Sequence, residues 1–124
     1  MDAATSSYFQ RVDAGLYAGH PALELNLLSR DAARALTADL HGHPVVALLD
    51  GLVLDDPGTS NHHVLLGCPP LKEHVLFLAH DEAARVVFPS LEAFLAAADA
   101  AVAGGIALPE LHPNHPPVLA DQHA

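Results

Sequence analysis

The stretch LAHDEAARVVFPSLEAFLAAADAAV, residues 78–102, decides the predicted fold. It passes from one apolar run through the polar trio His80, Asp81 and Glu82 into a second apolar run, ARVVF. A short polar segment between two β-prone runs is typical of a hairpin loop, because Asp side chains bond nearby backbone N–H groups in turns. The sequence therefore predicts two paired strands with the trio at their bend, and the alternative is an acid–base or metal-binding cluster.

The second half of this stretch predicts an amphipathic helix. Pro89 ends the strand, Ser90 can cap the first turn, and the charge of Glu92 suits the positive end of the helix dipole. Gly104 and Gly105 follow, and Gly often ends a helix. The apolar stripe that would pack on the sheet consists of Leu91, Phe94, Leu95, Ala98 and Val102.

Further strands are predicted upstream, at residues 62–67, 73–80 and 84–88. EHVLFLAH is apolar on both faces in its middle, as expected of a central strand that is covered on both sides. PVVALLDGLVL, residues 44–54, is also rich in β-formers, and its Asp-Gly pair is either a hairpin turn or a bulge. DDPGTSN, residues 55–61, predicts a turn.

The N-terminal third predicts one helix, at residues 29–42. Ser29 can cap it, and its apolar stripe would consist of Leu28, Ala32, Ala35, Leu36 and Leu40. Residues 23–28 predict a short strand or an extended lead-in, and residues 1–21 a short strand or an extended arm. Residues 106–124 form a Pro- and His-rich tail that could pack locally through Ile106, Leu108 and Leu111.

The chain has 124 residues, which suits a single domain over 1–124. Helices and adjacent antiparallel strands together predict an α+β fold in which helices pack against an antiparallel sheet. Cys68 is the only cysteine, so a reducing compartment fits, and no apolar run reaches the length of about 18 residues that a bilayer span requires. The first residues carry no secretion signal, so we expect a cytoplasmic protein without membrane attachment.

Fifteen acidic residues against five basic ones give a formal charge of −10. Such a surface repels phosphate backbones, so nucleic acid is not an expected partner. It suits a basic protein, whose association it would accelerate, and the alternative is that the charge only maintains solubility.

The ten histidines include three candidate metal-binding pairs: His41 with His43, His62 with His63, and His112 with His115. A metal site needs three or four converging ligands, and no cysteine pair supports any of these sets. Ser60 lacks the strand–turn–helix context of a nucleophile, and Cys68 precedes two prolines in apolar surroundings. We therefore expect no enzyme activity, no cofactor and no bound metal, although His80, Asp81 and the His pairs leave a small metal-dependent enzyme as an alternative.

From about Val45 to Val102 the chain resembles the SUKH superfamily of SMI1/KNR4-like domains. LLDGLVLDDPGTSNHHVLL looks like the central strands of that family with their turn, and the strand pair EHVLFLAHDEAARVVF follows. VFPSLEAFLAAADAAV looks like its terminal helix, with the residues Phe88, Ser90, Leu91, Phe94 and Leu95. The chain departs from the family in having no Trp and no Asn-Gly pair near the N-terminus.

The resemblance implies an α+β domain without catalytic residues, of the bacterial immunity-protein type that binds and blocks a cognate toxin. A regulatory or scaffold domain that binds cellular proteins is the alternative within the family. The sequence does not decide whether the chain forms a homodimer. Because loops carry recognition on a rigid scaffold, the expected partner-binding residues are Asp55, Asp56, Asn61, His62, Asp81 and Glu82.

Overall fold

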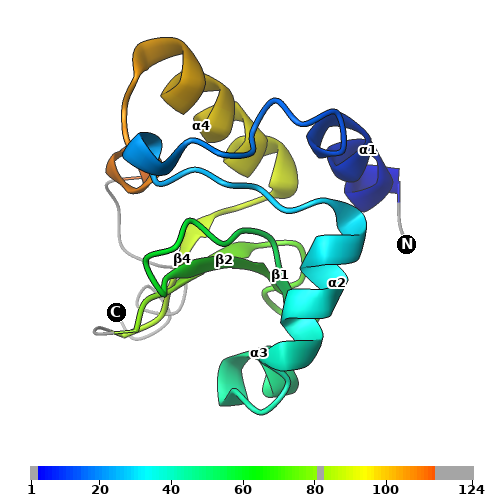
Figure 1. The fold of residues 1–124 in the computed structure, drawn as a ribbon. Coiled ribbons are helices and arrows are strands. Elements are labelled where there is room, and N and C mark those ends of the chain that lie inside the picture. The colour runs from blue at the N-terminus through cyan, green and yellow to red at the C-terminus, as the bar shows by residue number, and fades with distance from the viewer. Residues whose placement is uncertain (1–2, 81–82, 114–124) are drawn as a thin grey trace.

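The computed structural model describes residues 3–80 and 83–113. The predicted α+β fold is confirmed: four α-helices accompany a four-stranded antiparallel sheet of order β1-β2-β3-β4 (Figure 1). The helical elements, including two short 3-10 turns, are α1 (Ala3–Val12), η1 (Pro21–Leu23), α2 (Arg30–Asp39), α3 (Pro44–Leu48), α4 (Leu91–Gly104) and η2 (Leu108–Leu111). The strands are β1 (Leu52–Val53), β2 (His62–Leu65), β3 (Val75–Leu78) and β4 (Arg85–Phe88).

The strand pair around the polar trio forms as predicted. β3 pairs antiparallel with both β2 and β4, and all four of its residues are buried, which confirms it as a central strand covered on both faces. The connection between β3 and β4 therefore contains the trio. Of its members only His80 is described, because Asp81 and Glu82 lie outside the described residues.

The two predicted capped helices also form. The Ser90 hydroxyl accepts a hydrogen bond from the backbone N–H of Ala93 at the start of α4, and Gly105 ends that helix in the left-handed conformation. Ser29 caps α2 in the same way. The buried side of α2 was predicted correctly in part: Leu36 and Leu40 pack against the core, whereas Ala32 and Ala35 are exposed, and Ala33 and Thr37 lie inward instead.

Two segments differ from the expectation. Residues 3–12, expected to be a strand or an arm, form α1, whose buried residues Thr5, Tyr8, Phe9 and Val12 lie at helical spacing. The segment 44–54 is not β throughout, because α3 precedes the short β1, with Pro44 at its first position. The Asp-Gly pair joins α3 to β1, and a side chain at Gly51 would meet Val64 at 2.6 Å, so this close approach requires glycine.

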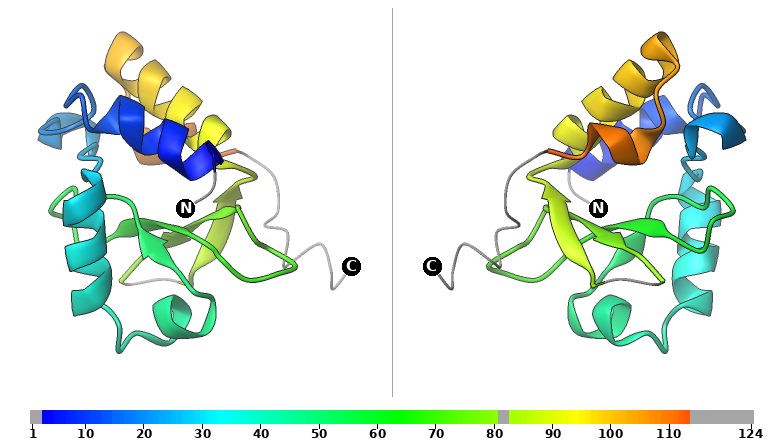
Figure 2. Two further views of the ribbon diagram at one scale, coloured as in Figure 1. Left: turned by 90° about the vertical axis from the view of Figure 1, so that its right-hand side faces the viewer. Right: turned by 90° about the vertical axis from the view of Figure 1, so that its left-hand side faces the viewer.

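The buried apolar residues form two clusters. Figure 2 shows that helices lie on both sides of the sheet. α1 and α4 cover one face, where Phe9, Phe94 and Leu108 are fully buried. α3 lies on the other face, where Leu36 and Leu40 at the C-terminal end of α2 pack with Val46 and Val64, whereas Ala33 of α2 belongs to the first cluster. Alternate strand residues point to opposite faces, which explains why neighbours in β3 belong to different clusters. No described helix has both the length and the apolar character needed to span a bilayer.

Candidate functional site

Two loops meet at one end of the sheet. The side-chain oxygen of Asn61 accepts a hydrogen bond from the backbone N–H of His80 at 3.1 Å and lies 2.9 Å from Nδ1 of the His80 ring. Asn61 precedes β2 and His80 follows β3, so these bonds join the β1–β2 connection to the β3–β4 connection. We call residues 55–62 and 79–80 together the loop rim.

A third segment holds the loop rim in place. The backbone N–H of Asp56 donates to the carbonyl of Asn26, and the Asn26 amide donates to the carbonyl of Asp56. The ring of His62 lies 2.8 Å from the carbonyl oxygen of Asp55. These bonds fix the backbone from which the Asp56 carboxylate extends into solvent.

The predicted partner-binding residues therefore have different surroundings. Asp56 is exposed, and Asn61 and His62 are half-buried on the loop rim. Asp55 was expected to be an exposed loop carboxylate and is instead 0% exposed, so it cannot contact a partner in this conformation. Asp81 and Glu82 lie outside the described residues.

Asp55 ends a chain of polar groups that runs through the core. Its two carboxylate oxygens accept the backbone N–H of His63 and face Nδ1 of the His63 ring, the latter at 2.8 Å. The other ring nitrogen of His63 lies 2.9 Å from Nε2 of His112. Nδ1 of His112 lies 3.4 Å from the guanidinium of Arg85.

Only one assignment of the ring protons gives each hydrogen bond from Asp55 to Arg85 both a donor and an acceptor. Arg85 can only donate, so Nδ1 of His112 accepts and its Nε2–H donates to His63. His63 then donates from Nδ1 to the Asp55 carboxylate. Every ring nitrogen is thereby engaged, which leaves no imidazole lone pair of His63 or His112 free to bind a metal or to abstract a proton from a substrate.

The two histidines belong to an aromatic cluster. The ring of His63 packs 4.9 Å from that of Phe94 and 5.1 Å from that of Phe77, and His112 packs 4.8 Å from Phe77. Burial lowers the pKa of His112 to about 3, and the neighbouring His63 and Arg85 add to this effect. His112 is therefore neutral at physiological pH, as the proton arrangement requires.

The other predicted histidine pairs are placed separately. His41 and His43 are exposed between α2 and α3, where Nδ1 of His43 accepts the backbone N–H of Val45 and caps α3. His62 and His63 point in different directions, as adjacent strand residues must. Within residues 3–80 and 83–113, no three His, Cys, Asp or Glu side chains come together as a metal site, and His115 lies outside this part of the chain.

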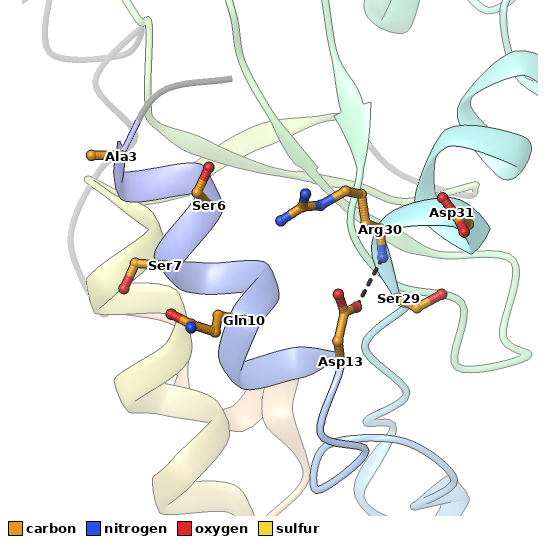
Figure 3. A pocket seen from close by; sticks show the side chains of 8 residues that line it. All are labelled: Ala3, Ser6, Ser7, Gln10, Asp13, Ser29, Arg30 and Asp31. Atoms are coloured by element: carbon orange, nitrogen blue, oxygen red, sulfur yellow. Dashed lines mark hydrogen bonds between the residues drawn. The ribbon is translucent and has the colours of Figure 1, made fainter.

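Two pockets adjoin where α1 approaches α2, and they share Ser7. Figure 3 shows the first, of about 850 Å³, which is lined by side chains of α1 and of the start of α2 on either side of a gap; Ser7 and Gln10 project from the side of α1 that is turned away from α2. The Arg30 guanidinium points into this gap, while the Arg30 backbone N–H donates to Asp13 (Figure 3). The second pocket, of about 860 Å³, extends over Leu52 and Leu65 toward the first turn of α4.

The sequence contains one indication that a histidine of this region is buried with a carboxylate partner. Adjacent His62 and His63 were expected on opposite strand faces, so one of them had to face a core, where an imidazole needs a polar partner. Asp55, one end of the loop that precedes them, was the nearest upstream carboxylate besides Asp56. No comparable signal marked His112, which lies 49 residues from His63 in the sequence.

The comparisons with protein-family models, with curated proteins and with solved structures find no match for this chain.

Proposed function

We propose that this chain is a non-catalytic binding protein of the immunity type, related to the SUKH superfamily, which neutralises a bacterial toxin by covering part of its surface. The α+β architecture agrees with what the resemblance implies, at the level of fold class. The formal charge of −10 favours a basic partner, because complementary charge accelerates association.

The observation that carries the proposal is the bond between Asn61 and His80, which joins two loops into the loop rim. A recognition surface needs exposed groups on a backbone that does not have to be ordered during binding. Asp56 meets this requirement, because Asn26 accepts a hydrogen bond from the Asp56 backbone N–H and donates one to the Asp56 carbonyl oxygen. His62 and His80 add polar groups on the same rim.

The buried polar chain supports a role without catalysis. A general base needs a lone pair within reach of a substrate proton. Asp55 and His63 are 0% and 2% exposed, and the arrangement of protons described above uses their acceptor atoms within the protein. Their role in this proposal is to fix the base of the loop rim.

The first experiment tests protection. The chain is co-expressed with the polymorphic toxin encoded directly upstream of its gene, and growth is compared with that of cells expressing the toxin alone. Restored growth is expected. Unrestored growth with both proteins present, or the lack of any toxin gene beside this one, contradicts the proposal.

The second experiment tests the loop rim. Asp56→Lys reverses one charge on it, and we expect its association rate with that toxin to fall about tenfold at low salt. Asp39→Lys makes the same change of charge on exposed α2, outside the rim, and is expected to slow association much less. Equal rates for the two variants would exclude the rim as the contact surface.

A further inference from the structure

The positive charge of this acidic chain is concentrated in one region. Of its five basic residues, four line the two adjoining pockets beside α1, and Arg85 lines neither. Five carboxylates line the same pockets, so four cations leave a formal charge of −1 there in a chain of charge −10. The four basic residues are Arg11, Arg30, Arg34 and Lys72.

Within the described residues, Arg11 is the one of these four cations whose side chain is hydrogen-bonded or ion-paired, and the Arg30 guanidinium lies over the ring of Phe9, 5.6 Å from its centroid. Arg11 already pairs with Asp99 at 3.0 Å and donates to Tyr17. Arg34 and Lys72 are exposed, and within the described residues no hydrogen bond or ion pair engages their side chains. The guanidinium of Arg30 extends into the gap between α1 and α2 (Figure 3), and its buried Nε bonds to no described group.

A second buried polar group without a described partner lies beside the other pocket. Tyr8 lines the larger pocket and is only 3% exposed, yet its hydroxyl makes no hydrogen bond to the described residues. Burial, and then the charge of Asp55, raise the pKa of Tyr8, so this hydroxyl stays a donor. Buried polar atoms almost always have a partner in the protein, a water or a bound ligand.

The floor of the larger pocket is apolar. Leu52 and Leu65 are paired across β1 and β2 and are half-buried, and Leu91 and Leu95 of α4 line the same pocket. Its volume of about 860 Å³ lies within the range of about 300–1,000 Å³ that is usual for small-molecule sites. The pocket thus combines a leucine floor with unpaired donors at its edge.

We infer that this pocket binds a small amphipathic carboxylate, whose head group meets Arg34 and Lys72 and whose apolar chain lies on Leu52 and Leu65. A carboxylate fits better than a phosphate ester. The second charge of a phosphate would be repelled by the carboxylates of Asp50, Glu73 and Glu92, which line the same pocket.

Octanoate is the probe, and calorimetry with the full chain is the test. We expect saturable binding of octanoate. Acetate should bind at least tenfold more weakly because it lacks the apolar tail, and 1-octanol at least tenfold more weakly because it lacks the negative charge. The double variant Arg34→Gln with Lys72→Gln should weaken octanoate binding about tenfold, which corresponds to the loss of about 1.4 kcal/mol.

Arg85→Gln is the control for a positive charge lost outside the pockets: it removes one charge, where the double variant removes two, from a residue that lines neither pocket. It should bind octanoate as the unchanged chain does. The inference is overturned if octanoate does not saturate, if the double variant binds as tightly as Arg85→Gln, or if octanol binds as tightly as octanoate. Circular dichroism of each variant establishes that the fold is kept.

Discussion

At the residue scale, Asp55 is the anion at which the buried polar chain ends. Its carboxylate is fully buried and accepts hydrogen bonds from the backbone and the ring of His63. Asp55→Asn keeps the shape but places an NH₂ group where an acceptor is needed, and such an unmatched buried group costs about 1–3 kcal/mol. We expect the free energy of unfolding, measured by urea titration, to fall by about this amount.

The neighbouring residue supplies the control for this prediction. Asp56 is exposed, so Asp56→Asn should change the free energy of unfolding by less than about 0.5 kcal/mol. If both variants lost the same stability, Asp55 would not have the anchoring role that its burial indicates.

His112 makes the free energy of unfolding depend on pH. Its pKa is lowered from 6.5 to about 3, chiefly by burial. Between these values the unfolded chain binds a proton at His112 that the folded chain does not bind. Stability therefore rises with pH in this window, and the contribution of neutral His112 is present above its ordinary pKa and is lost as the pH falls toward about 3.

The variant His112→Gln tests this dependence, because an amide can still donate to His63 but does not titrate. Urea unfolding is measured at about pH 7 and at about pH 5, where the carboxylates shared by both proteins contribute equally. The unchanged protein should lose more stability between the two conditions than the variant does. Parallel losses would assign the acid sensitivity to other groups.

Single residues also explain what the sequence could not predict about the site. The loop signal in DDPGTSN was correct, but loops are usually exposed, and this reasoning placed Asp55 in solvent. Its burial depends on a bridge to Leu27 and on His63, contacts that span 28 and 8 residues. The loop composition of residues 55–61 alone does not indicate such tertiary pairing.

At the scale of elements, the cap of α4 sets where the helix begins. The Ser90 hydroxyl accepts the N–H of Ala93, one of the first N–H groups that have no partner within the helix. Ser90→Ala should lower the free energy of unfolding by about 1 kcal/mol. Ser7→Ala, at an exposed position within α1, is the control and should cost almost nothing, since Ala favours a helix. A loss no larger for Ser90→Ala than for this control would contradict the capping role.

Elements with a strong local pattern were predictable, and those defined by packing were not. β2, β3, β4, α2 and α4 all carried strand composition or a Ser cap, and they form close to their expected bounds. α3 was missed because Val-Val-Ala-Leu-Leu has no polar face, so periodicity cannot distinguish strand from helix. α1 was missed for another reason. Its buried residues Thr5, Tyr8, Phe9 and Val12 lie at helical spacing, but the small polar residues between them made this pattern weak.

At the scale of the whole molecule, the charge of −10 opposes folding, because a compact chain brings like charges together. Salt screens this repulsion, with a Debye length of about 10 Å at 0.1 M. Salt also weakens the exposed pair between Arg11 and Asp99, but such pairs contribute only about 0–1 kcal/mol. We therefore expect the melting temperature at about pH 7, measured by calorimetry, to rise between low and moderate NaCl.

The pH dependence of this salt effect separates charge screening from other actions of salt. Near the isoelectric point of about 5.2 the net charge approaches zero, so little repulsion remains to be screened. The same increase in NaCl should then raise the melting temperature much less than at neutral pH. An equal rise of the melting temperature at both pH values would mean that salt stabilises the fold because its ions are excluded from the protein surface. The repulsion among the acidic residues would then contribute little to the stability of this fold.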